Sequence, residues 1–167
     1  MIEITPEWPE DSAAIETLLD AAFGPNRQVK ISYSYRDGVE RLWPLCLVAR
    51  DDARIIGTIR YWPIAIGRSP VLLLGPVAIS AEHRAHGLGG ALIRASLALA
   101  AENGHRAVLL VGDEPYYGRF GFHPARDHGV VMPRENAARV LALSLDPANA
   151  FPAGEVRSWR SVRRAAA

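Results

Sequence analysis

The spacing of apolar residues along the chain predicts two amphipathic helices. In residues 12–23 apolar side chains recur every three or four positions, and Gly24-Pro25 ends the pattern. Residues 88–103 show the same spacing more strongly, with Gly104 as the expected C-cap. Residues 26–41 show no clean period, so we expect a short helix followed by a loop there.

Strand-length apolar runs lie between and after these helices. They comprise residues 45–49 and 54–66, which Asp51-Asp52 separates as in an antiparallel hairpin, and residues 71–79 and 107–111. Weaker signals are a strand over 2–5, a short helix over 114–119, and strand and helix material in 130–132 and 139–145. The order strand, helix, strand from residue 71 to 111 predicts a parallel, right-handed crossover. The fold class is therefore predicted to be α/β (α+β).

Composition narrows the class of protein without identifying it. The 167 residues, 49% of them hydrophobic, suit a single domain over 1–167, and the net charge of +1 argues against nucleic-acid and membrane partners. A lone cysteine, Cys46, allows no internal disulfide and fits a reducing compartment. No leader-like start or membrane-length apolar run is present, so we expect a cytoplasmic protein. The arginine-rich end, about 155–167, is typical of a solvated and flexible basic tail.

A glycine-rich turn joins the predicted strand at 71–79 to the helix that begins near residue 88. Backbone N–H groups at a helix start lack internal partners, and glycines let a ligand approach the main chain, so this turn suits a pyrophosphate. It contains neither a Gly-x-Gly-x-x-Gly nor a Gly-Lys-Ser/Thr motif, which excludes the two commoner phosphate loops. An ordinary tight turn remains the alternative. Its residues are Arg84, Ala85, His86, Gly87, Leu88, Gly89 and Gly90.

The strand before this turn is interrupted by Gly75-Pro76. Proline removes a donor from the ladder and marks an edge or a bulge, so the strand is predicted to diverge there from its parallel neighbour. The backbone groups of Val77, Ala78 and Ile79 would then be free to bond an extended ligand as a further strand would. A bulge that serves packing alone is the alternative.

These motifs resemble those of the GCN5-related N-acetyltransferase (GNAT) superfamily, most closely its small bacterial branch of predicted N-acetyltransferases. The resemblance covers residues 74–124 and includes Gly75-Pro76-Val77-Ala78-Ile79, Arg84-x-x-Gly87-x-Gly89-Gly90 and Tyr116-Tyr117-Gly118-Arg119-Phe120-Gly121-Phe122. It implies a mixed, mostly antiparallel central sheet with helices on both faces and a V-shaped split between the two central parallel strands.

The resemblance also implies an activity: acetyl-CoA-dependent transfer of an acetyl group to an amine of a small molecule or protein. Acetyl-CoA is then the cosubstrate, with its pantetheine arm along Val77, Ala78 and Ile79 and its pyrophosphate on the turn from Arg84 to Gly90. No metal is expected, because no histidine spacing suits zinc. A homodimer is compatible with the family.

Transfer to an amine needs a donor for the oxyanion and an acid for the leaving thiolate. A backbone N–H near Val77 or Ala78 is the expected oxyanion donor. Tyr117 matches the family's tyrosine four residues before the Gly of Gly-Phe and is the expected acid. Relatives often have an asparagine before this helix, whereas this chain has Gly112-Asp113-Glu114-Pro115, so contacts from that loop to CoA are open.

The general base and the acyl group stay open in the sequence. Asp113, Glu114, Glu40 and Asp37 are candidate bases, and water could relay the proton instead. Cys46 lies in an apolar run, which favours a buried thiol and direct transfer over a covalent intermediate. The alternative functions are transfer of a longer acyl group such as succinyl, or a catalytically idle acyl-CoA-binding sensor.

Overall fold

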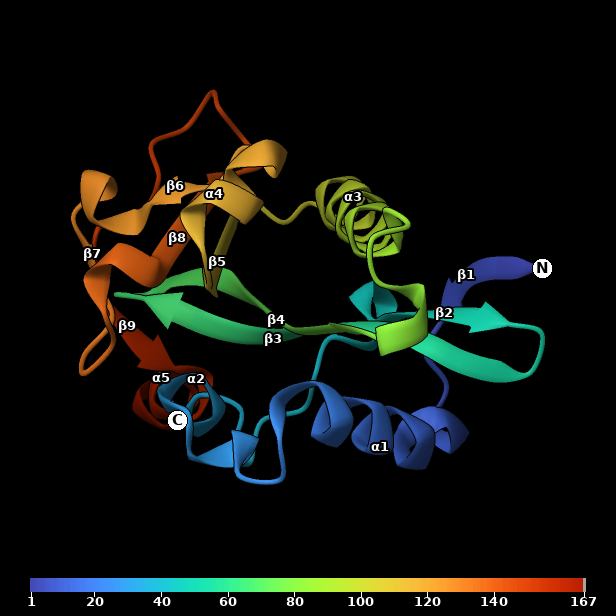
Figure 1. Ribbon diagram of the computed structural model, residues 1–167. Coiled ribbons are helices and arrows are strands. Elements are labelled where there is room, and N and C mark those ends of the chain that lie inside the picture. Colours follow the sequence, from blue (N-terminus) through green and yellow to red (C-terminus); the bar gives the residue numbers. More distant parts are fainter. Residues whose placement is uncertain (167) are drawn as a thin grey trace.

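A mixed β-sheet with helices on both faces organises residues 1–166, the part of the chain that the computed structural model describes (Figure 1). The strands are β1 (Ile2–Pro6), β2 (Leu47–Asp51), β3 (Arg54–Ile66), β4 (Ser69–Ile79), β5 (Ala107–Val111), β6 (His123–Pro124), β7 (Val130–Val131), β8 (Val140–Ser144) and β9 (Gly154–Ser158). The helices are α1 (Ser12–Phe23), α2 (Ile31–Ser34), α3 (Leu88–Glu102), α4 (Glu114–Tyr117) and α5 (Trp159–Ala166). The predicted helix at 12–23 and strand at 107–111 thus have the expected bounds.

The strand order is β1-β2-β3-β4-β5-β8-β6, and along it only β4 and β5 pair in parallel. Helix α3 connects these two strands, which confirms the predicted crossover. Helices α3 and α4 lie on one side of the sheet in Figure 1, and α1, α2 and α5 lie on the other. The mostly antiparallel sheet with helices on both faces agrees with the predicted fold class.

The two parallel strands separate soon after they meet. β4 pairs with β5 only at Leu72 and Leu73, which lie opposite Val108 and Leu109. Beyond them β4 passes through the cis peptide Gly75-Pro76 and continues to Ile79 along β3 alone, with a shift in the β3–β4 register at the same level. The predicted V-shaped split is therefore present, and it opens at the carboxyl ends of β4 and β5.

Some boundaries differ from those predicted. β2 begins at Leu47 rather than residue 45, because Trp43–Leu45 forms a 3-10 turn around a proline. The C-cap of α3 is Asn103, and Gly104 follows it with a φ of 81°. The segment expected as a basic tail contains β9 and α5. β9 pairs with β3 at residues 64–66 and with β7, and its Val156 is buried, so one apolar side chain among charged neighbours anchors it.

Charged side chains are buried between α1 and the sheet. Arg60 of β3 donates from Nε and Nη2 to the two carboxylate oxygens of Glu7, at 3.0 and 2.8 Å, and from Nη1 to Glu16 at 2.9 Å. Arg27 bonds Glu16 and Asp20, and Arg41 pairs with Glu7 at 2.9 Å. Every nitrogen of Arg60 thus has an acceptor, as a buried charge requires. Among residues 1–166, no helix is both long and apolar enough to cross a membrane.

Candidate functional site

The glycine-rich turn lies directly before α3, as the sequence predicts. Gly87 is the N-cap of α3 with a φ of 73°, a left-handed conformation that favours glycine. The N–H groups of Leu88, Gly89 and Gly90 are the first of the helix, where no intrahelical acceptor exists. Gly89 also allows a close approach, because a Cβ there would lie 3.0 Å from the hydroxyl of Tyr116. The turn therefore presents backbone donors and the positive end of a helix to the same space.

Three arginines surround that space, a cavity of about 470 Å³ between the turn and α4. Arg84 comes from the turn, where its Nε lies 3.3 Å from the carbonyl oxygen of Ile79. Arg94 comes from α3, and its guanidinium lies 5.1 Å from the ring centre of Phe120. Arg119 follows α4 and stacks 4.5 Å from the ring centre of Tyr116. Positive charge and backbone donors together suit a polyphosphate.

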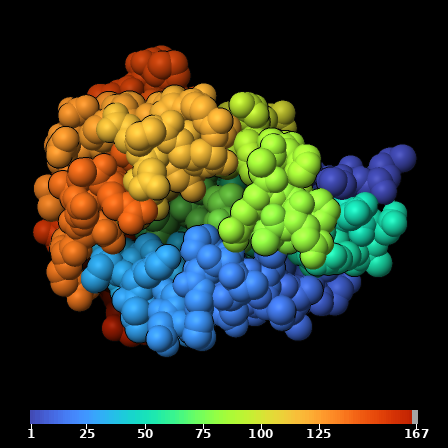
Figure 2. Space-filling view, viewed as in Figure 1, coloured from blue at the N-terminus to red at the C-terminus, as the bar shows by residue number. Residues whose placement is uncertain are grey.

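The split between β4 and β5 holds a second cavity of about 560 Å³. Its floor includes Gly75, Pro76 and Val77 of β4, and Leu110 and Val111 of β5. Tyr116 lines both this split cavity and the one at the turn, so the two adjoin. Figure 2 shows the hollow: the green strand is visible at the bottom, between the light-blue segment, the yellow-green turn and the orange segment. One elongated ligand can therefore reach from the turn into the split.

The free edge of β4 offers only alternate backbone groups to a ligand in the split. Antiparallel pairs alternate between bonded and non-bonded, and the N–H of Ser80 donates to Ile56 at 2.8 Å. By this alternation Ala78, opposite Thr58, points its backbone groups at β3, whereas Val77 and Ile79 point theirs into the split. Of the two oxyanion donors considered in the sequence, the geometry thus favours the N–H of Val77 over that of Ala78.

Tyr117 lies at the wall of the split cavity at the end of α4. Its ring makes edge contacts with Tyr116 at 4.9 Å and Phe122 at 6.1 Å between ring centres. A methyl group at Gly112 would overlap the ring, so glycine there lets Tyr117 pack against β5. Burial, with smaller contributions from Tyr116 and Asp113, raises the pKa of Tyr117 to about 12. The hydroxyl is therefore protonated at neutral pH and can donate.

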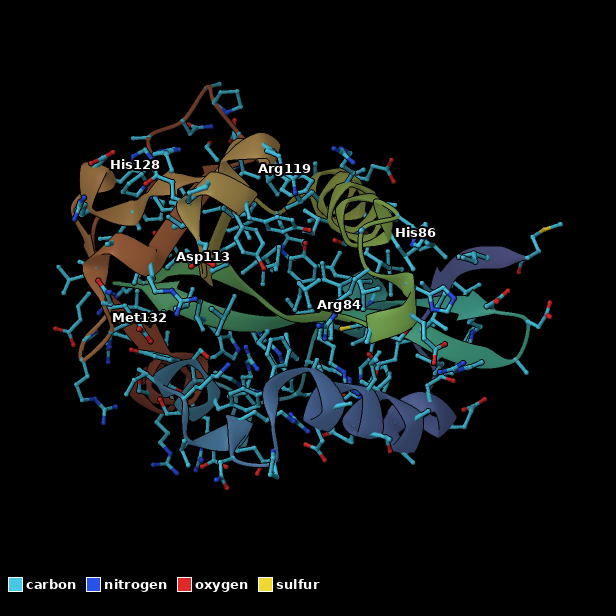
Figure 3. All side chains as sticks on the ribbon, viewed as in Figure 1. Arg84, His86, Asp113, Arg119, His128 and Met132 are labelled. Atoms are coloured by element: carbon cyan, nitrogen blue, oxygen red, sulfur yellow. The ribbon has the colours of Figure 1, made fainter. Side chains whose placement is uncertain are left out.

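Several predicted residues point away from the cavities. His86 lies on the outer side of the turn, whereas Arg84, Arg119 and Asp113 lie around the opening (Figure 3). The side chain of Ala78 packs in a buried apolar cluster with residues of α1, and Leu88 is buried in the core under α3. Of the candidate bases, Asp113 lines the split cavity and lies 3.6 Å from Arg139. Glu40 and Asp37 instead line a neighbouring cavity.

Other residues at the site had no role in the sequence interpretation. Tyr116 adjoins Tyr117, and sequence gives no basis for separating two consecutive tyrosines. Arg94 follows Gly90 by four positions, a spacing that places both on one helix face and would have indicated it. Arg36 and Glu135 line the split cavity from irregular segments that carry no period.

Cys46, His123 and His128 lie apart from these cavities, whereas His83 lines the cavity at the turn. Cys46 is fully buried, donates to the carbonyl of Leu42, and has its pKa raised to about 11 by burial. The imidazoles of His123 and His128 lie 2.6 Å apart, and His128 stacks on Phe151. Within the described residues, no three His, Cys, Asp or Glu side chains gather as metal ligands would.

The chain is similar to known acetyltransferases in sequence and in structure. Residues 12–122 match the profile of the Acetyltransferase (GNAT) family. The uncharacterized N-acetyltransferase YhbS of Escherichia coli strain K12 is 31% identical over 128 residues, 75% of each chain. A crystal structure of Escherichia coli YhbS with CoA superposes with a TM-score of 0.82 at 26% identity, over 98% of this chain and 92% of that one. A crystal structure of a Brucella melitensis GNAT family acetyltransferase with acetyl-CoA superposes with a TM-score of 0.71 at 31% identity, over 94% of this chain and 95% of that one.

Proposed function

Because the chain belongs to the GNAT family of acetyltransferases, we propose that it transfers the acetyl group of acetyl-CoA directly to an amine of a small molecule or protein. The observation that carries the proposal is the continuity of the two cavities. The cavity at the turn offers backbone donors and arginines to a pyrophosphate, and it adjoins the split through Tyr116. Relatives of known structure were crystallised with CoA and with acetyl-CoA.

Acetyl-CoA would lie along both cavities, from the glycine-rich turn into the split. The N–H groups from Ala85 to Gly90 and the side chain of Arg84 hold the pyrophosphate, with support from Arg94 and Arg119. His86 and Leu88 contribute backbone only, because their side chains point elsewhere. Val77 and Ile79 bond the amides of the pantetheine arm as a neighbouring strand would. Ala78 contributes the backbone shape rather than hydrogen bonds.

The reaction needs one bond made and one broken. The amine nitrogen bonds the carbonyl carbon of the thioester, and the N–H of Val77 donates to the oxygen as it gains negative charge. The carbon–sulfur bond then breaks, and Tyr117 donates its hydroxyl proton to the departing thiolate. The nitrogen loses one proton to water or to a base. Buried Cys46 takes no part, so transfer is direct.

Two carboxylates can take the proton from nitrogen. Asp113 lines the cavity beside Tyr117, and Glu135 lines it from the segment after β7. The exposed Asp113 carboxylate pairs with Arg139 at 3.6 Å, whereas Glu135 makes no ion pair with the described residues. Glu135 is the better candidate on this ground. A reducing cytoplasm is the expected setting for the single free thiol.

Binding and turnover test the proposal separately. We expect calorimetry to show CoA binding, and Arg84→Ala to weaken it roughly tenfold through loss of a charged hydrogen bond. Arg68→Ala is the matched control, because Arg68 is an exposed arginine in the turn between β3 and β4. Thiol release from acetyl-CoA should then accelerate with at least one member of an amine panel that includes polyamines, amino acids and peptide N-termini.

Each alternative predicts a different result. CoA binding without acceleration by any amine would favour the idle sensor. Faster turnover with succinyl-CoA than with acetyl-CoA would favour a longer acyl donor. Absence of CoA binding would contradict the assignment of the turn.

A further inference from the structure

Arg36 lies at the junction of two cavities and makes no ion pair with the described residues. It follows α2 and lines the split cavity as well as a neighbouring cavity of about 730 Å³ between residues 28–41, Trp43, Trp62 and Arg134. Its Nε and Nη1 atoms are buried and have no hydrogen-bond partner among the described residues. Buried guanidinium donors are normally satisfied, so two unpartnered nitrogens in a residue that lines two cavities point to a missing acceptor.

Two aromatic rings lie against the guanidinium of Arg36. The guanidinium carbon lies 4.2 Å from the ring centre of Tyr33 and 5.8 Å from that of Trp62. Trp62 is itself fixed, because its indole N–H donates to the carbonyl of Gly75 at 2.8 Å. Aromatic rings support the charge through its faces, whereas the N–H groups point outward in the plane. Nη2 together with Nε or with Nη1 forms a planar edge of two donors, which matches a carboxylate that accepts two parallel hydrogen bonds.

Arg36 lies close to the part of β4 where we propose that the acetyl group is transferred. Its Nη2 lies 3.2 Å from where a Cβ of residue 75 would be, so Gly75 lets the guanidinium approach the strand. Val77, the proposed oxyanion donor, is two residues further along β4. A carboxylate on Arg36 would thus lie a few bonds from an amine poised at the thioester.

The charged residues that line the split cavity also suit an anionic ligand. Lys30, Arg36 and Arg139 line it against Asp113 and Glu135, and Arg139 lies near Asp113. Burial lowers the pKa of Arg36 to about 10, so the guanidinium is still charged at neutral pH. An anionic group on the occupant would relieve the unfavourable burial of this charge.

We propose that Arg36 binds a carboxylate of the acceptor, so that the acceptor is a small amine that also carries an acid, as an amino acid does. This inference rests on the proposed function, because it assigns the occupant beside the thioester to the acceptor. It makes Arg36 a specificity-determining residue rather than one that takes part in the bond changes.

Binding is measured first, on protein saturated with CoA, so that it does not depend on turnover. The probes are glycine, L-leucine, L-phenylalanine, β-alanine and 4-aminobutyrate, each beside its primary amide, with affinities from ligand-observed NMR titration. For at least one pair the acid should bind roughly 10- to 100-fold more tightly than the amide, as for a charged hydrogen-bonded pair.

Variants assign the preference to Arg36. Arg36→Met should bring the ratio of acid to amide close to one, and Arg36→Lys should retain part of it, because lysine keeps the charge but lacks the planar donors. Arg68→Met is the control and should keep the wild-type ratio, because Arg68 is an exposed arginine in the turn between β3 and β4 and lines neither cavity. Unchanged CoA affinity reports that each variant is folded.

The outcomes separate this inference from the proposed function. Equal binding of acids and amides, binding of neither, or a preference that survives in Arg36→Met would overturn the role of Arg36. A preference for succinyl-CoA over butyryl-CoA that depends on Arg36 would also overturn it, since the carboxylate would then belong to the donor. Binding of an acid through Arg36 without acetylation of any amine would leave the carboxylate site standing, but it would refute the proposed transfer and with it the assignment of the bound acid as the acceptor.

Discussion

Arg60 and Arg36 both bury guanidinium nitrogens, yet one lies in a closed network and the other beside a cavity. Arg60 has an acceptor for each nitrogen, in Glu7 and Glu16. Burial alone lowers its pKa, but the hydrogen bonds to Glu7 and Glu16 outweigh burial and raise it. For Arg36 burial prevails and the pKa falls to about 10. The direction of the shift therefore follows whether the fold itself supplies the counter-charge.

The difference separates two uses of a buried charge. The network around Arg60 joins the segment before α1 to β3 and belongs to the folded structure. Arg36 lies against aromatic rings, and two of its nitrogens have no partner among the described residues. Changing each in turn should affect different measurements.

The largest effect is expected from Arg60→Met. Loss of this guanidinium leaves Glu7, whose side chain is fully buried, with Arg41 as its remaining charged partner. Breaking a buried pair from one side costs about 3–5 kcal/mol. Urea unfolding followed by circular dichroism measures this change. A loss below about 1 kcal/mol would show that the network resembles surface ion pairs, and the contrast with Arg36 would fail.

Tyr117→Phe should reduce kcat roughly tenfold, at or below the low end for general acids because a thiolate already leaves readily. The ring contacts with Tyr116 and Phe122 remain, so the free energy of unfolding should hardly change. Steady-state kinetics and an unfolding curve on the same preparation measure both. An unchanged kcat would remove Tyr117 from the reaction, whereas a large loss of stability would assign it to packing.

Glu16, at the exposed edge of the network, should contribute a smaller and pH-dependent amount. Burial raises its pKa, but hydrogen bonds from Arg60 and Arg27 outweigh burial, so the net shift is downward from 4.5. A lowered folded-state pKa gives stability that is present above the unfolded value and is lost as pH falls through the folded value. Since Glu16 is 44% exposed, we expect less than about 1 kcal/mol.

The measurement is the free energy of unfolding between pH 7 and pH 3 for the wild type and Glu16→Gln. The wild-type curve should fall more steeply below pH 4.5 than that of the variant. Parallel curves would show that the two arginines do not stabilise the Glu16 carboxylate.

The smallest effect on stability is expected from Arg36→Met. The substitution replaces an unpaired buried charge with an apolar side chain, a change that is often neutral or slightly stabilising. The free energy of unfolding should change by less than about 1 kcal/mol in either direction. A loss as large as that expected of Arg60→Met would mean that Arg36 is a structural residue, which would break the comparison.

Helices and strands whose apolar residues form a clear pattern over several positions could be predicted from the sequence. Ile15, Leu18 and Leu19 fix the buried face of α1, and the continuous apolar run at 107–111 has the length typical of a buried strand. β6 and β7 have two residues each, too few to show alternation. In β9 one buried valine lies between a glutamate and an arginine, so its role depends on the partner strand β3 rather than on its own sequence.

The candidate site, like the fold, has one part that could be predicted from the sequence and one part that could not. The turn before α3 has glycines whose conformations depend on the local chain, so its outline can be predicted. A side chain of the turn enters the cavity or points away from it according to its direction around the start of α3. A residue of β4 does so according to the alternation of directions along the strand. The outward direction of His86 and the pairing of Ala78 with β3 follow from these and are not encoded locally. Arg36 is one of 19 basic residues, and only its surroundings in three dimensions distinguish it.

The late position of β9 in the chain has a consequence during synthesis. Its partner, the apolar stretch Ile64–Ile66 of β3, is made long before residues 156–158 that cover it. At about 5–20 residues per second, the 89 residues between them take roughly 4–18 s to translate. During that time the nascent chain carries an unprotected strand edge, which is the kind of surface that chaperones bind and that aggregates. A nascent chain that stalls before residue 154 would keep this edge exposed.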